Sequence, residues 1–138
     1  MRLGTVPLLP LTVAALTSAA ASLARAAEGD VAVGGEFLLR IRVPASGLSV
    51  RQRVDAIHDR LAEILADTRI GMADVQVERA RDGILLILVK RHPLVTVTPA
   101  DGQANGLSAQ RQAEIWARQV RKVLPQVNVR PNPATGQR

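Results

Sequence analysis

The sequence predicts a single α+β domain, with one sheet of four to five strands and two helices on one face, in the split β-α-β (ferredoxin-like) arrangement. Three observations lead to this class. The length of 138 residues suits one domain. Stretches of alternating apolar residues, typical of strands, are interspersed with stretches of helical periodicity. A Gly-Leu-Ser start to an amphipathic helix occurs twice, at 47–49 and 106–108, and each helix leads into a Val-x-Val stretch, as two β-α-β units would.

Residues 1–26 carry the pattern of a secretory signal peptide and lie ahead of the domain. Arg2 supplies a positive start, an apolar stretch covers 6–23, and an Ala-x-Ala cleavage motif ends at Ala26. We therefore expect cleavage after Ala26 and a periplasmic or secreted protein. The alternative is an uncleaved anchor helix, which the two prolines of the segment disfavour.

A strand and a helix open the domain. The first strand is indicated by a period of two over 37–43, which predicts one strongly apolar, buried face. That face carries Phe37, Leu39, Ile41 and Val43, and the opposite face carries Leu38, Arg40 and Arg42. The helix begins at Ser49, and Gln52 follows in capping-box spacing, where each side chain satisfies a free backbone N–H. Apolar residues then recur at helical spacing as far as Leu65, so this helix also has one buried face.

Three shorter strands follow the first helix. They are indicated by the alternation over 75–77, the unbroken apolar run over 84–89 and the alternation over 94–98. Asp82-Gly83 is a hairpin-turn pair, because glycine adopts positive φ without steric cost. Residues 90–93 form a second turn before the last of these strands.

A polar loop over 99–106 precedes the second helix, which Ser108 caps. One apolar face of this helix is predicted from helical spacing and carries Ala109, Ala113, Trp116, Val120 and Leu124. Pro125 ends that helix, because proline has no backbone N–H and its ring clashes with the preceding turn. A short last strand is expected at 127–129. The expected divisions of the chain are a signal peptide over 1–26, one α/β domain over 33–130 and a disordered tail over 131–138.

The composition argues against an enzyme. The chain has no Cys, two His, one Phe, one Trp and no Tyr, so thiol catalysis, disulfides and cysteine-based zinc sites are excluded. We expect no catalytic residue, no metal site and no cofactor. The formal charge is +6, but the arginines are scattered and few aromatic side chains accompany them, so we expect no nucleic-acid partner.

The run over 84–89 is apolar on both faces, whereas two helices on one side of a sheet cover only one. We therefore expect the helix-free face to be an interface with a second copy or with another protein. Its residues would be Leu38, Leu85, Ile87 and Leu94. The alternative is that the loop over 99–106 or the tail folds across this face.

Two other functions remain open from the sequence. Arg40 and Arg42 would be the contacts of a binding module for anionic envelope polymers. A small hydrolase would need His92, Asp101 and Ser108 to converge, yet Ser108 already caps a helix and the chain has no Gly-x-Ser-x-Gly turn to expose it.

Several segments resemble the extracytoplasmic N-terminal region that precedes the membrane spans of bacterial small-conductance-type mechanosensitive channels. The most specific is Val-Thr-x-x-Asp followed by a Ser-capped helix with Ala and Trp. The resemblance covers about 33–124. Its segments are Gly-Gly-Glu-Phe-Leu-Leu-Arg-Ile (34–41), Ser-Val-Arg-Gln-Arg-Val-Asp-Ala-Ile (49–57), Leu-Val-Thr-Val-Thr-Pro-Ala-Asp (94–101), Gly-Leu-Ser (106–108) and the helix over 113–116.

The resemblance implies an accessory or sensory module outside the membrane, without a pore helix, and it maps no functional residue onto this chain. We therefore predict a secreted, non-enzymatic interaction or accessory module of the cell envelope, beside a membrane complex such as a mechanosensitive channel. Contact with the membrane itself would come only from proximity to that complex.

Overall fold

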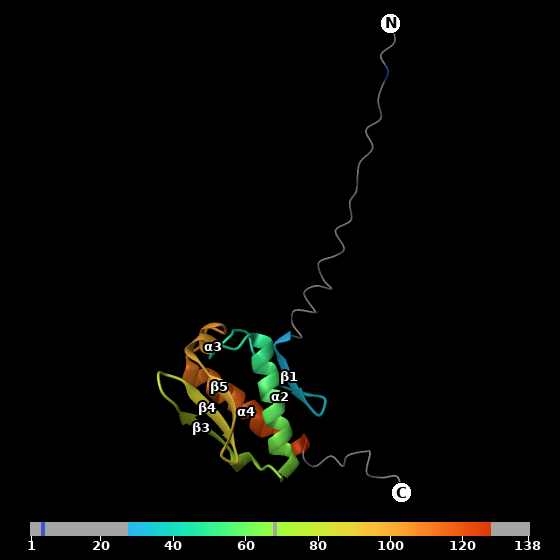
Figure 1. The fold of residues 1–138 in the computed structure, drawn as a ribbon, viewed down its shortest axis with the longest axis vertical. Helices are drawn as coiled ribbons and strands as arrows, with labels where there is room; N and C mark the ends of the chain where they lie inside the picture. The colour runs from blue at the N-terminus through green and yellow to red at the C-terminus, as the bar shows by residue number, and fades with distance from the viewer. Residues whose placement is uncertain (1–3, 5–27, 68, 128–138) are drawn as a thin grey trace.

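The computed structural model describes residue 4 and residues 28–67 and 69–127. Apart from residue 4, the predicted signal peptide lies outside the described residues, as does the predicted tail. Along the chain a hairpin is followed by a helix, a three-stranded meander and two further helices (Figure 1). The elements are β1 (Asp30–Val33), β2 (Glu36–Arg40), α2 (Val50–Asp67), the 3₁₀ turn η1 (Met72–Asp74), β3 (Val75–Arg79), β4 (Leu85–Val89), β5 (His92–Val97), α3 (Pro99–Gln103) and α4 (Ala109–Val127).

The described strands form two antiparallel sheets instead of the predicted single sheet. The predicted α+β class is confirmed. β1 pairs with β2, and β3, β4 and β5 form a separate sheet in that order. Gly34 and Gly35 reverse the chain between β1 and β2 with φ of +57° and +80°, which glycine adopts without steric cost. The residues ahead of this turn therefore pair with β2 as the strand β1, which the sequence pattern did not predict.

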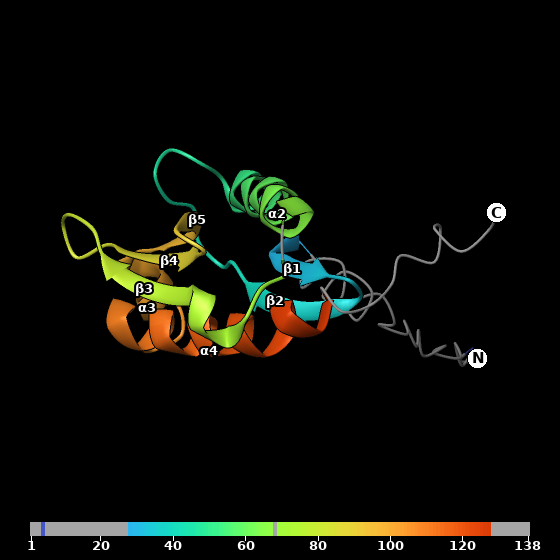
Figure 2. The same ribbon diagram turned by 90° about the horizontal axis from the view of Figure 1, so that it is seen from below.

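The two long helices lie on opposite sides of the strands, rather than on one face as predicted. Figure 2 shows α4 below the strands and α2 above them. α4 packs on β2 and on all three strands of the second sheet, while α2 packs on β1 and along β5. The β1–β2 hairpin thus packs against both long helices, with β1 on α2 and β2 on α4.

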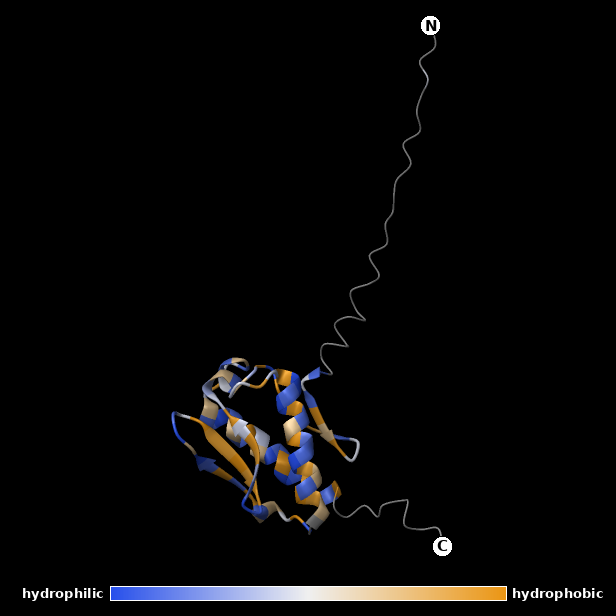
Figure 3. Ribbon diagram, in the orientation of Figure 1, coloured by the Kyte–Doolittle hydropathy of each residue, from blue (hydrophilic) through white to orange (hydrophobic). Residues whose placement is uncertain are grey.

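The core lies between these layers, and its most apolar strand is β4, the central strand of the three-stranded sheet. β4 is apolar throughout (Figure 3). All of its residues except the half-buried Leu86 are buried. Burial of this apolar surface is the main stabilising contribution to the fold. The largest fully buried side chains are Leu38, Leu39, Ile41, Ile57, Ile87, Leu94, Leu124, Val31, Val89, Val95, Val97 and Val120.

The segment predicted as a polar loop over 99–106 contains the short helix α3. Thr98 caps it, because its hydroxyl accepts a hydrogen bond from the N–H of Asp101 at 3.2 Å and the Asp101 carboxylate accepts one from the N–H of Thr98. At the other end of the chain α4 continues through Pro125 to Val127. The predicted last strand therefore does not begin at Val127, and its remaining residues lie outside the described ones.

Helix side chains cap the carbonyls at the free edges of the strands. Unpaired edge groups are sites where another strand can add, and proteins commonly block them. This is a role for the arginine excess that composition alone does not reveal. The contacts are Arg53 to Thr96 O (3.0 Å), Arg60 to Leu94 O (3.2 Å), Arg121 to Val75 O (3.1 Å), Gln119 to Phe37 O (3.1 Å) and His58 Nε2 to Ala32 O (3.2 Å).

Candidate functional site

The residues predicted to form an exposed interface are buried. Leu38, Ile87 and Leu94 are 0% exposed and Leu85 is 4% exposed. The prediction was wrong because it placed both helices on one face, whereas α2 and α4 cover the strands from opposite sides. An apolar strand such as β4 is then covered within the chain, and the predicted residues present no exposed apolar face.

The hydrolase candidates do not converge. His92 begins β5 and Asp101 lies in α3 beyond its end, so the length of the strand separates them by about 15 Å or more at 3.3 Å per residue. The hydroxyl of Ser108 accepts a hydrogen bond from the N–H of Arg111 at 3.1 Å, which is a helix-capping contact. His92 therefore lies apart from Asp101, and Asp101 and Ser108 take part in the caps of two different helices.

The two arginines predicted to contact anions differ in their surroundings. The guanidinium of Arg40 pairs with the carboxylate of Asp30 on the neighbouring strand β1. The hydrogen bond and the charge of Asp30 raise the pKa of Arg40, because both favour its protonated form. Arg42 is exposed. Arg40 is thus already engaged with a carboxylate, which leaves Arg42 as the exposed one of the two.

A buried ion pair joins two segments that carry the channel resemblance. Arg53 and Asp101, 6% and 2% exposed, form two hydrogen bonds of 2.8 and 3.0 Å. Arg53 also donates to the carbonyls of Val43 and Thr96, at 2.7 and 3.0 Å. Thr98 donates to Asp101 from its N–H and its hydroxyl, at 2.8 and 2.9 Å. All of these bonds stay within the chain, so the motif has a structural role here.

An apolar groove of about 460 Å³ lies between β2 and α4. Leu38, Leu39 and Trp116 form its buried floor, whereas Phe37 and Ile115 are 47% and 38% exposed. Phe37 and Trp116 are the only aromatic residues of the chain, and both line this groove. Exposed apolar side chains grouped around a recess are typical of binding surfaces.

A β-bulge explains why Phe37 faces outward. The register of the hairpin shifts so that Val31 faces Leu39 while Ala32 faces Phe37, which leaves Leu38 as an extra residue in β2. Leu38 and Leu39 are then both buried, and the alternation predicted from the sequence breaks at this point. The bulge thus moves Phe37 out of the predicted core face and into the groove.

One stripe of α4 forms the opposite wall. Ile115, Arg118, Gln119 and Lys122 have the i, i+3, i+4, i+7 spacing that places side chains on one helix face. The side-chain amide of Gln119 donates to the carbonyl of Phe37 at 3.1 Å, which fixes the wall against the strand. The groove is therefore held by a direct bond between its two walls.

The rim of the groove is positively charged. Arg118 and Lys122 are exposed, and none of the lining residues is acidic. Glu114, the acid next to Ile115 in α4, pairs with Arg111 one turn earlier at 3.3 Å. The groove thus combines an apolar floor with two cations, which suits a ligand that carries apolar groups beside negative charge.

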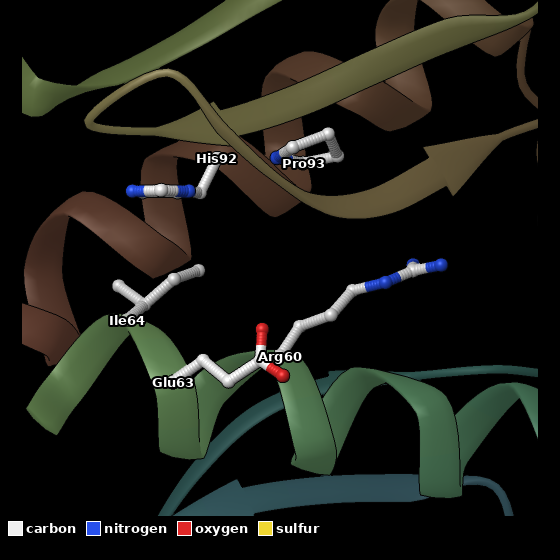
Figure 4. A pocket seen from close by; sticks show the side chains of 5 residues that line it. All are labelled: Arg60, Glu63, Ile64, His92 and Pro93. Atoms are coloured by element: carbon white, nitrogen blue, oxygen red, sulfur yellow. The ribbon is translucent and has the colours of Figure 1, made fainter.

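A second hollow of about 320 Å³ lies between α2 and the start of β5. In Figure 4, His92 and Pro93 face Ile64 and Glu63 across it, and Arg60 extends along the strand away from His92. The guanidinium of Arg60 caps the carbonyl of Leu94. This hollow has one apolar side chain from α2 and no aromatic residue, so the groove between β2 and α4 is the stronger candidate.

The chain thus forms a small α+β domain with an open apolar groove on its surface. The chain belongs to the family described as Domain of unknown function (DUF8459), whose model matches residues 30–127. No curated protein and no solved structure matches the chain. Among the described residues, no helix combines the length and the apolar character needed to cross a membrane.

Sequence reasoning missed this groove, although part of its signal is present in the sequence. The spacing of Ile115, Arg118 and Lys122 is visible beside the apolar stripe of the last helix. What the sequence does not show is the bulge at Leu38, because each residue of the Phe37–Leu39 run is apolar. Alternation alone therefore could not distinguish the exposed residue of this run from the buried ones.

Proposed function

We propose that this protein is a non-enzymatic interaction module, and that the groove between β2 and α4 is its binding surface. The observation that carries the proposal is the meeting of the only two aromatic residues, Phe37 and Trp116, in one groove with Ile115. Aromatic side chains are enriched at protein interfaces because they bury large apolar areas at low entropic cost. This surface takes the place of the helix-free face expected from the sequence.

The setting of the proposed module is the cell envelope, beside a membrane complex such as a mechanosensitive channel. The signal-peptide pattern of residues 1–26 supports the location, and the resemblance to the extracytoplasmic region of such channels supports the association. The predicted alternative is an anionic envelope polymer bound at Arg40 and Arg42. Binding of such a polymer would weaken steeply with salt, whereas apolar docking would not.

Photo-cross-linking in the producing cell tests the proposal. A photoreactive benzoylphenylalanine would replace Ile115 in one variant and Met72 in a control, since Met72 is 64% exposed on η1 and does not line the groove. We expect one discrete adduct from position 115, none from position 72, and its loss when Phe37→Ser is added. Equal adducts at both positions, or none at position 115, would overturn the proposal.

A further inference from the structure

We infer that the groove between β2 and α4 binds an acidic amphipathic helix of a partner protein. This inference rests on the proposed function and specifies the chemistry of the partner. The groove offers an apolar floor, two exposed apolar residues and two exposed cations. An amphipathic helix would place its apolar face on the floor and carboxylates beside the cations.

The positive charge of the groove distinguishes between the possible partners. Arg118 and Lys122 line the groove without an acidic neighbour in its lining. A second copy docked symmetrically at the same groove would bring like charges together, which is unfavourable. The C-terminal residues 128–138 contain two arginines, Arg130 and Arg138, and no acid, so this segment has the wrong sign as well. An acidic partner is the complementary one.

The shape of the groove favours a partner helix over a membrane surface as its ligand. Trp116 is recessed at 6% exposure, whereas peripheral membrane binding uses apolar side chains that protrude into the lipid. Ile115 to Lys122 spans about 10 Å along α4 at 1.5 Å per residue, or about two helical turns. A partner helix with apolar residues at i, i+3, i+4 and i+7 presents an apolar face of the same length.

Trp116 is the only tryptophan of the chain, so its fluorescence reports binding at the floor of the groove. The titrant would be a tryptophan-free synthetic peptide of about 18 residues, since shorter helices are marginal in water. It would carry leucine at the spacing above and glutamate on the flanks. A twin peptide with lysine in place of each glutamate and vesicles of phosphatidylglycerol are the comparison titrants.

Two variants and their matched controls separate charge from apolar contact. The pair Arg118→Glu and Lys122→Glu reverses the rim, and its control is Arg51→Glu with Arg81→Glu, two exposed arginines outside the groove lining. All four side chains are exposed, so folding is expected to be preserved. Phe37→Ser removes an apolar contact; Met72→Ser, at a comparably exposed position, is its control.

We expect the acidic peptide to change the Trp116 emission and to bind at least about tenfold more tightly than its lysine twin. Arg118→Glu with Lys122→Glu should abolish this preference for the acidic peptide, whereas the control pair Arg51→Glu with Arg81→Glu should retain it. Equal binding of both peptides, sensitive to Phe37→Ser, would overturn the acidic partner and leave the proposed groove standing. Tighter binding to the vesicles than to the acidic peptide would assign the surface to a membrane. Peptide binding unaffected by both groove variants would place the contact elsewhere and overturn the inference.

Discussion

Replacing Arg53 with methionine would keep the aliphatic bulk of the side chain and remove its guanidinium from a buried site. Asp101 would lose two hydrogen bonds and its counter-charge while remaining 2% exposed, with only the bonds from Thr98 left. The carbonyls of Val43 and Thr96 would lose their donor as well. Removing one partner of a buried ion pair costs about 3–5 kcal/mol, because the remaining charge is left uncompensated.

The size of this loss makes it easy to measure. The free energy of unfolding of a small domain is about 5–15 kcal/mol, so the variant would lose about a fifth or more of its stability. Urea unfolding followed by Trp116 fluorescence would report it, since this single tryptophan is 6% exposed in the folded chain. With a slope of about 1–3 kcal/mol per molar urea, the midpoint should fall by about 2 M.

A double variant separates the ion pair from the loss of the carbonyl contacts. Adding Asp101→Asn to Arg53→Met removes the uncompensated charge. The double variant should therefore lose about 1–3 kcal/mol less unfolding free energy than the two single variants lose together. Additive losses, or a single loss below about 1 kcal/mol, would refute the reasoning that this pair locks α2 to α3.

Three further changes test other parts of the fold. Ile87→Ala should cost about 2–5 kcal/mol in urea unfolding because Ile87 is fully buried, and Leu86→Ala, at a half-buried position, should cost less; equal losses would contradict the assignment of the core face. Lys90→Asn with Arg91→Gly should stabilise by about 1 kcal/mol in thermal unfolding, since these residues hold φ of 48° and 68° in the β4–β5 turn; a lower melting temperature would count against it. Gly102→Ala should lower the melting temperature, because a Cβ there would lie 2.6 Å from the Leu107 carbonyl oxygen; an unchanged value would contradict this close approach.

Local signals in the sequence predicted several elements correctly. The Ser49–Gln52 capping box is present, with bonds of 2.9 and 3.2 Å at the start of α2. Asp82-Gly83 forms the predicted turn, and both residues have positive φ. These features depend on residues close together in the chain, so the chemistry of each short segment is enough to specify them.

Features that depend on distant pairing were not predictable in the same way. Periodicity shows that α2 and α4 each have a buried face but does not say on which side of the strands either helix lies. The prediction that both helices share one face led directly to the buried Leu38 and Ile87 being assigned to an interface. The side of each helix is decided by packing across the whole core, which no local segment contains.

The candidate groove was hidden for a related reason. Trp116 was correctly expected on the buried face of its helix, but Phe37 was expected beside Leu39 in the core. The bulge at Leu38 reverses this orientation, and a run of three apolar residues carries no mark of where a bulge falls. Trp116 and Phe37 are also distant in sequence, so only the fold brings them together.

Hydroxyl-radical footprinting in intact producing cells tests the central claim, that the groove between β2 and α4 is covered by a partner. Phe37 and Met72 are 47% and 64% exposed in the free chain, so both should react in the purified protein. In intact cells we predict that Phe37 is protected severalfold relative to Met72, and that Arg118→Glu with Lys122→Glu restores its reactivity. Unchanged reactivity of Phe37 relative to Met72 in intact cells would contradict the account.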